Sequence, residues 1–252
     1  MRMNGDKRVV WITGAGKGIG RALAKRMAND GWAVAASART EQDLKSLQSE
    51  CPKGSINCFL LDVTDPVATS SVVARIVNEV GTINLVVLNA GNHIPMTVKN
   101  FSSKTVRTLI DTNLMGAVYG LEQIIPMFSD RKHGHIAVVA SLAGYRGLPT
   151  SSAYGASKAA LINMCESLKP ELDLVGVKLT LINPGFVETP LTDKNEFPMP
   201  FLIPVEEAVD AIIEGLKTSA FEISFPLRFA LLMKVLRVLP HRIYFALTNK
   251  MI

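Results

Sequence analysis

The chain has 252 residues, of which 48% are hydrophobic and 19% charged, so it can bury the core of one α/β domain and is not disordered as a whole. Its net charge of +5 arises from residues 223–252, which hold five basic residues and no acidic residue. The rest of the chain has 22 basic and 22 acidic residues. A basic tail on a neutral body argues against a protein whose whole surface binds nucleic acid.

The three cysteines do not show a pattern typical of disulfide bonds or of metal ligands. Cys51, Cys58 and Cys165 are odd in number and have no CxxC or metal-ligand spacing. The sequence therefore predicts neither disulfides nor a metal site, and the cytoplasm, a reducing compartment, is the simplest location. The first strand-like segment, residues 8–13, runs directly into a glycine motif, so no cleavable signal peptide is expected.

Short apolar segments alternate with longer amphipathic ones. The predicted strands are residues 8–13, 33–38, 57–63, 84–90, 135–141 and 178–183, and the predicted helices are residues 19–30, 41–50, 66–80, 104–128 and 152–174. The strand segments are nearly continuous runs of Val, Ile, Leu and Ala, which is typical of strands buried on both faces. Repeated strand–helix units predict a single Rossmann-type α/β domain, a doubly wound parallel sheet with helices on both faces. Pro170 should kink or end the last helix.

A glycine-rich motif, TGAGKGIG, covers residues 13–20 between the first strand and the first helix. Glycines permit a tight turn and close approach to phosphates, and a helix N-terminus attracts anions. This context predicts a dinucleotide-binding site that includes Gly14, Gly18, Ile19 and Gly20, rather than a glycine turn without a ligand.

The second strand indicates which dinucleotide binds. An NAD site usually has an acid at this strand's end, whereas here the strand ends Ala36–Ser37–Ala38 and is followed by Arg39. Arg39, together with Lys17 from the glycine motif, could pair with the 2′-phosphate of NADP(H). We therefore predict NADP(H) as the cofactor, with Lys17, Ser37 and Arg39 among its contacts.

A tyrosine and a lysine four residues apart, Tyr154 and Lys158, lie on one face of the last predicted helix. A nearby ammonium stabilises phenolate and lowers the pKa of a tyrosine, which makes it a usable acid and base. Ser141 ends the fifth predicted strand, at the carboxyl edge where open α/β sheets bind ligands. A Tyr–Lys pair alone is weak evidence, but the added serine makes a catalytic set.

At this point the chain resembles the short-chain dehydrogenase/reductase family over residues 7–220. The matching motifs are the glycine motif, Asp62 with Val63, Asn89–Ala90–Gly91, Asn113, the set Ser141, Tyr154 and Lys158, and residues 183–189. The departure is Leu88, where the family often has an asparagine. The resemblance implies further cofactor contacts at Asp62, Val63, Asn89, Ala90, Gly91, Pro184, Gly185, Val187 and Thr189.

The resemblance also implies a reaction, the interconversion of a carbonyl and a secondary alcohol by hydride transfer with NADP(H). Tyr154 would be the general acid and base, Ser141 would hold the substrate oxygen, and Lys158 would bind the nicotinamide ribose. Asn113 would hold a water that links Lys158 to solvent. The alternative is a catalytically silent NADP-sensing protein, but such proteins commonly lose the tyrosine or the lysine.

Apolar segments point to an apolar small-molecule substrate. The loop 189–204 contains Phe197, Met199 and Phe201, and we expect His93, Ile94, Tyr145 and Leu148 at the same mouth. His93 is interpreted as a loop residue rather than an acid–base group. A 3-oxoacyl thioester, a steroid or retinoid and a small ketone or aldehyde all remain open.

The C-terminal region is an apolar and basic extension. Residues 1–225, ending in an edge strand, form the predicted catalytic domain, and residues 226–252 form helices. The extension packs on its own domain, on a partner subunit or on a membrane surface, and the sequence leaves these alternatives open. The family resemblance implies a homodimer or homotetramer.

Overall fold

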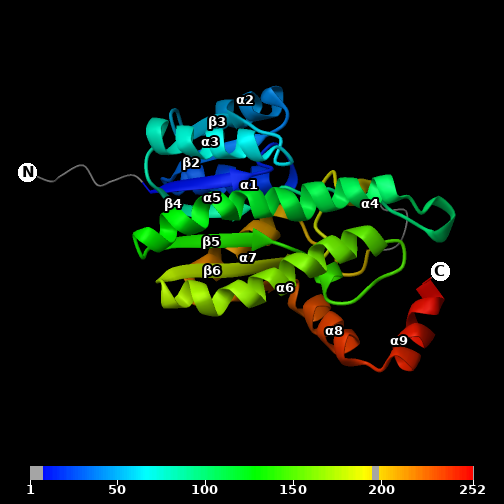
Figure 1. Cartoon of the computed structure of the whole chain (residues 1–252). Helices are drawn as coiled ribbons and strands as arrows, with labels where there is room; N and C mark the ends of the chain where they lie inside the picture. The colour runs from blue at the N-terminus through cyan, green and yellow to red at the C-terminus, as the bar shows by residue number, and fades with distance from the viewer. Residues whose placement is uncertain (1–7, 195–198, 252) are drawn as a thin grey trace, which may run out of the picture.

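A parallel sheet forms the centre of the protein, seen here in a computed structural model that describes residues 8–194 and 199–251. Within those residues the sheet has seven strands in the order β3-β2-β1-β4-β5-β6-β7 (Figure 1). Their bounds are β1 Val9–Thr13, β2 Ala33–Ala38, β3 Ile56–Leu60, β4 Ile83–Leu88, β5 Gly134–Val139, β6 Val177–Pro184 and β7 Glu222–Phe225. The strand order reverses at β1 and β4, so the predicted doubly wound sheet is confirmed.

Helices cover both faces of the sheet. They are α1 Gly18–Asn29, α2 Glu41–Ser49, α3 Pro66–Glu79, α4 Ser103–Ile110, α5 Gly116–Asp130, α6 Ser152–Leu174, α7 Val205–Lys217, α8 Leu227–Val238 and α9 His241–Thr248. Side chains of α1, α2 and α7 pack in one core cluster, and those of α3, α5 and α6 in the other. Along β1 the side chains alternate between the clusters, so its apolar run is continuous because both faces are buried.

The predicted helix 104–128 is interrupted in the structure. A π-helical turn, Asp111–Met115, separates α4 from α5. The reason is a set of contacts made by Asn113, described below, which no periodic pattern displays. Such turns are frequent at functional sites.

Of the two outcomes expected at Pro170, a kink or the end of the helix, the second is wrong. Helix α6 continues past this proline to Leu174. Pro170 and Glu166, whose carbonyl loses a helical hydrogen bond to it, are both exposed. Water can therefore satisfy that carbonyl, which reduces the cost of the proline.

The C-terminal extension follows the edge strand β7 and lies outside the α/β body (Figure 1). Lys234 Nζ donates to Glu222 Oε2 at 2.6 Å, and Arg146 donates to the main-chain oxygen of Arg237 at 2.6 Å. The ring of Phe229 stacks on that of Phe186, with centroids 5.4 Å apart. In the described part of the chain, no helix is long and apolar enough to cross a membrane.

One half-buried histidine is expected to make the fold sensitive to acid. His135 on β5 is bonded through Nε2 to Thr180 Oγ1 on β6 at 2.9 Å. Burial, and to a smaller extent the charge of Lys178, lower the His135 pKa to about 3. Between that value and the ordinary histidine pKa of about 6.5, the unfolded chain binds the additional proton, so stability falls as the pH falls.

We expect the free energy of unfolding of His135→Asn to fall less steeply with decreasing pH than that of the wild type. The difference in slope should be up to about 1 kcal/mol per pH unit. Urea unfolding at several pH values between about 6.5 and 4 measures the slope of the unfolding free energy against pH. The exposed His133 provides the control, as His133→Asn. An unchanged slope in His135→Asn would show that this histidine does not cause the loss of stability at low pH.

Candidate active site

The glycine motif forms a tight loop between β1 and α1. Gly14 has φ +68°, and a Cβ there would come within 2.8 Å of Ala90 Cα. The Thr13 hydroxyl accepts from the backbone nitrogens of Asn89 at 3.0 Å and Ala90 at 3.1 Å. These bonds hold the loop after β4 against the glycine motif, beside the start of α1, which has no side-chain cap. An uncapped helix start directs its N–H groups at an incoming anion.

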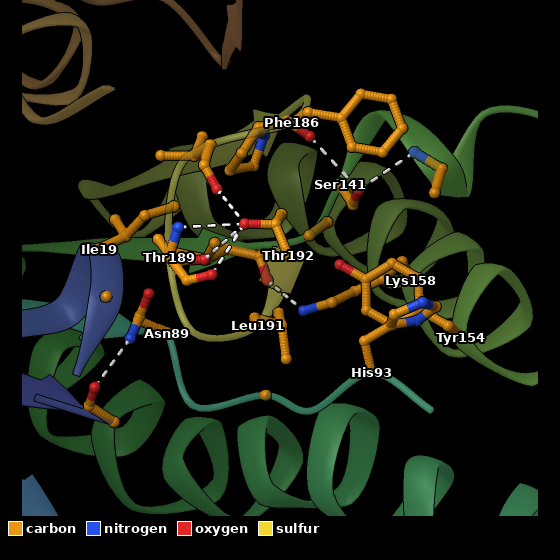
Figure 2. Close-up of a pocket in the computed structure, with 18 of the residues that line it drawn as sticks. Ile19, Asn89, His93, Ser141, Tyr154, Lys158, Phe186, Thr189, Leu191 and Thr192 are labelled. Atoms are coloured by element: carbon orange, nitrogen blue, oxygen red, sulfur yellow. Dashed lines mark hydrogen bonds between the residues drawn. The ribbon is translucent and has the colours of Figure 1, made fainter. Parts of the chain in front are cut away.

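A cavity of about 1090 Å³ opens at the carboxyl ends of the strands. It brings together most residues expected to bind cofactor or substrate. Those lining it are Gly14, Lys17, Gly18, Ile19, Arg39, Asp62, Val63, Asn89, Ala90, Gly91, Ser141, Tyr154, Lys158, Pro184, Gly185, Val187 and Thr189. Figure 2 shows Ile19 and Asn89 on one side of the pocket, and His93, Tyr154 and Lys158 on the other.

Two expected cofactor contacts do not line the cavity. Ser37 is fully buried, and its hydroxyl accepts from Trp11 Nε1 at 3.0 Å. A Cβ on Gly20 would lie 2.4 Å from both Gly14 O and Asn89 Nδ2. Ser37 therefore bonds within the core, and Gly20 allows α1 to pack closely against the two loops.

Asn113 also lies outside the cavity, because it is fully buried. Its Nδ2 donates to Asn92 O at 2.9 Å and to Ser157 Oγ at 3.0 Å, while Oδ1 accepts from Asn92 N at 2.7 Å. Both amide hydrogens are used, so the side chain ties the loop after β4 to α6. Its expected role as holder of a relay water is not visible in these contacts.

Three elements position the catalytic set. Ser141 follows β5 and caps the short 3-10 turn Leu142–Gly144, accepting from Ala143 N at 3.1 Å. Tyr154 and Lys158 lie one turn apart near the start of α6. Lys158 Nζ donates to Val139 O at 2.8 Å and lies 6.0 Å from the centroid of the Tyr154 ring (Figure 2).

Burial controls the protonation of this pair. It raises the pKa of Tyr154, an effect that a hydrogen bond with the Ser141 hydroxyl opposes. Burial also lowers the pKa of Lys158 to about 8. At neutral pH the tyrosine is therefore protonated and the lysine is charged, which is the state required to donate a proton.

His93 was expected to be an ordinary loop residue at the mouth. It lines the cavity but is only 6% exposed, and its ring meets that of Tyr154 edge-on, with centroids 4.8 Å apart. Leu148 lines the cavity as predicted, whereas Ile94 does not and packs beside Tyr154 in a small cluster. Phe197 lies outside the described residues.

Tyr145 was also expected at the mouth, and this is wrong. Its hydroxyl donates to Glu222 Oε1, which also accepts from Asn183 Nδ2 at 2.7 Å. Burial and the Glu222 carboxylate raise the Tyr145 pKa well above its ordinary value. The ring therefore supports the loop after β5 from behind, away from the cavity.

Sequence reasoning missed two parts of the cavity. Asp43, in the first turn of α2, lines it, and its Oδ2 lies 3.7 Å from Lys17 Nζ. The inner face of α8 supplies an apolar wall made by Phe229, Leu232, Met233 and Leu236. The apolar spacing of α8 was visible in the sequence, but the surface on which it packs was not.

Comparisons with known proteins identify the family of the chain. A family model described as short chain dehydrogenase matches residues 8–198. The chain belongs to the short-chain dehydrogenase/reductase family. An uncharacterized oxidoreductase of Myxococcus xanthus is 38% identical to this short-chain dehydrogenase over 246 residues, which cover 97% of each chain. The protein is thus an oxidoreductase of a family that uses nicotinamide cofactors.

Solved structures agree with the fold of this short-chain dehydrogenase. ElxO, in a structure with NADP bound, is 24% identical with a TM-score of 0.77, covering 86% of this chain and 97% of ElxO. A short chain dehydrogenase/reductase from Burkholderia phymatum in complex with NAD is 22% identical with a TM-score of 0.82, covering 92% and 93%. One fold accepts both cofactors, so the choice between them depends on individual side chains.

Proposed function

We propose that this short-chain dehydrogenase interconverts a carbonyl and a secondary alcohol with NADP(H), on an apolar substrate. The observation that carries the proposal is the presence of Ser141, Tyr154 and Lys158 in one cavity with the glycine motif and the uncapped start of α1. We call the glycine motif and this helix start the phosphate cradle. A silent sensor of the same fold would not need the buried tyrosine and lysine to lie together.

The residues of the cradle fit a dinucleotide phosphate. The uncapped start of α1 opens into the cavity, and Lys17 and Arg39 line the same end. A 2′-phosphate carries negative charge that a guanidinium can bind through two N–H groups. Lys17 already faces Asp43, so Arg39 is the cation we expect to decide between NADP(H) and NAD(H).

The catalytic residues would divide the work of carbonyl reduction. The cofactor, when bound, supplies the hydride. The Tyr154 hydroxyl donates its proton to the substrate oxygen, while the Ser141 hydroxyl donates a hydrogen bond to the same oxygen. The Lys158 ammonium then stabilises the phenolate. This help is lost as the pH rises through the lowered Lys158 pKa of about 8.

The walls of the cavity favour an apolar substrate. Beyond the catalytic set it is lined by Leu142, Leu148, Phe186, Leu191 and the inner face of α8. Burial of each methylene contributes about 0.8 kcal/mol, so apolar length should improve binding. We therefore propose a lipid-like carbonyl as the substrate class rather than a small polar ketone.

NADPH oxidation measured against carbonyls of increasing chain length tests this function. We expect kcat/KM to rise by up to about fourfold per methylene until the cavity is full. Leu232→Lys places a charge on the α8 wall and should lower kcat/KM for long substrates at least about tenfold, with little effect on short ones.

The control is Leu174→Lys, since Leu174 is exposed at the end of α6 and does not line the cavity. Binding of NADPH without oxidation of it by any carbonyl would instead support the silent sensor. A preference for short, polar carbonyls would contradict the substrate class while leaving the reaction type intact.

The assembly of the enzyme is also a proposal. The family oligomerises, and we expect a homodimer or homotetramer. Sedimentation velocity on the full chain measures this directly, and a monomer at micromolar concentration would contradict it.

A further inference from the structure

The extension has two unlike faces. Its inner face is buried: Phe229 stacks between Phe186 and Phe201, with ring centroids 5.4 Å and 5.9 Å away, and Met233 is 1% exposed. On the opposite side of α8 lie Leu227, Leu231, Val235 and Val238, spaced by four, four and three residues and 55% to 78% exposed. This spacing places them on one side of the helix, where the described residues leave them open to solvent.

Helix α9 carries further exposed apolar side chains. Its Tyr244 is buried, with the Arg146 guanidinium 4.4 Å above its ring, and its hydroxyl donates to Gly147 O. The neighbouring Ile243, Phe245 and Leu247 are 46% to 53% exposed. We call the four α8 residues the outer face of the extension.

Basic residues border the outer face. Arg228, Arg242 and Lys250 are exposed, and the extension has no acid in its sequence. Lys234, by contrast, is held by Glu222 of β7. An apolar helical surface bordered by cations is the pattern of a helix that lies in the interface of an anionic membrane.

The extension contributes residues to the lining of the cavity. Leu232 lines the cavity while remaining 44% exposed, and Lys250 also lines it. A single helix, α8, therefore carries both an apolar cavity wall and an apolar exterior.

We propose that the outer face of the extension docks on an anionic lipid surface, from which the apolar substrate enters the cavity. The docking stands on the extension alone, whereas the entry of substrate rests on the proposed function. A second copy of the chain fits this face less well. In a contact with two-fold symmetry, the same basic residues of both copies would lie around one interface. The extension has no acidic residue that could lie between them.

Co-sedimentation of the full chain with vesicles tests the docking. The vesicles contain phosphatidylcholine alone or phosphatidylcholine mixed with phosphatidylglycerol. We expect the wild type to pellet with the mixed vesicles, and Leu231→Glu/Val235→Glu to bind them at least about tenfold more weakly. Val67→Glu/Leu174→Glu is the matched control, because both residues are exposed apolar side chains outside the extension.

Three outcomes would overturn the docking: no wild-type binding to mixed vesicles, equal loss in the control variant, or equal binding by both double variants and the wild type. A dimer that Leu231→Glu/Val235→Glu dissociates, without vesicle binding, would assign the face to a second copy. NADPH oxidation with a soluble carbonyl is measured on the same samples. Vesicle binding without turnover would contradict the proposed function and leave the docking intact.

Discussion

Replacing Tyr154 by phenylalanine should lower kcat for carbonyl reduction by about a thousandfold or more, while the Kd for NADPH stays nearly unchanged. In the proposed function the hydroxyl is the proton donor, and Tyr154 lines the cavity together with Ser141 and Lys158. Phenylalanine keeps the ring and its edge-on contact with His93, so the packing survives. Steady-state kinetics and a fluorescence titration with NADPH measure the two effects separately.

The control for this prediction is Tyr119→Phe, since Tyr119 also lies on a helix but does not line the cavity. We expect that variant to keep its turnover. If Tyr154→Phe retained the wild-type kcat, the assignment of Tyr154 as the acid would be wrong. A thousandfold loss of NADPH affinity would instead show that the ring position had changed.

Arg39→Asp should lower kcat/KM for NADPH by about a hundredfold and raise it for NADH. A charge-assisted hydrogen bond contributes about 1.5–3 kcal/mol, and the introduced carboxylate repels the 2′-phosphate besides removing that bond. A loss of about 2.7 kcal/mol corresponds to a hundredfold change. The new acid would then stand where an NAD site has its ribose partner.

The neighbouring charges provide the controls for Arg39. Lys45→Asp makes the same change of charge on α2 at a residue that is paired with Glu41 and does not line the cavity, so cofactor preference should hold. Asp43→Asn removes the acid facing Lys17 and should strengthen NADPH binding. An Arg39→Asp enzyme that still preferred NADPH would remove Arg39 from this role.

Much of the sheet and of the cofactor side is predictable because the signals are local. The continuous apolar run of β1, the glycine motif after it and the lack of an acid at the end of β2 are all read from adjacent residues. The edge strand β7 likewise lies at the end of the predicted catalytic domain. Tyr154 and Lys158 follow from helical spacing.

The remaining features depend on contacts between distant residues, which leave no local pattern. Ser37 forms a hydrogen bond in the core with Trp11, 26 residues earlier. Tyr145 forms a hydrogen bond with Glu222, 77 residues later, and so does not line the cavity. Asn113 is held by Asn92 and Ser157. Each polar group satisfies its hydrogen bond where the tertiary structure offers one, so residue type alone cannot reveal its partner.

The wall that α8 adds to the cavity has a consequence for the order in which the site is assembled during synthesis. Translation runs from the N-terminus, and domains begin to fold in that order. A nascent chain that has folded through β6 holds the phosphate cradle and the set Ser141, Tyr154 and Lys158. Its substrate side remains open until α8 leaves the ribosome. The proposed cofactor-binding residues up to Pro184 are therefore synthesised before the α8 residues that wall the cavity.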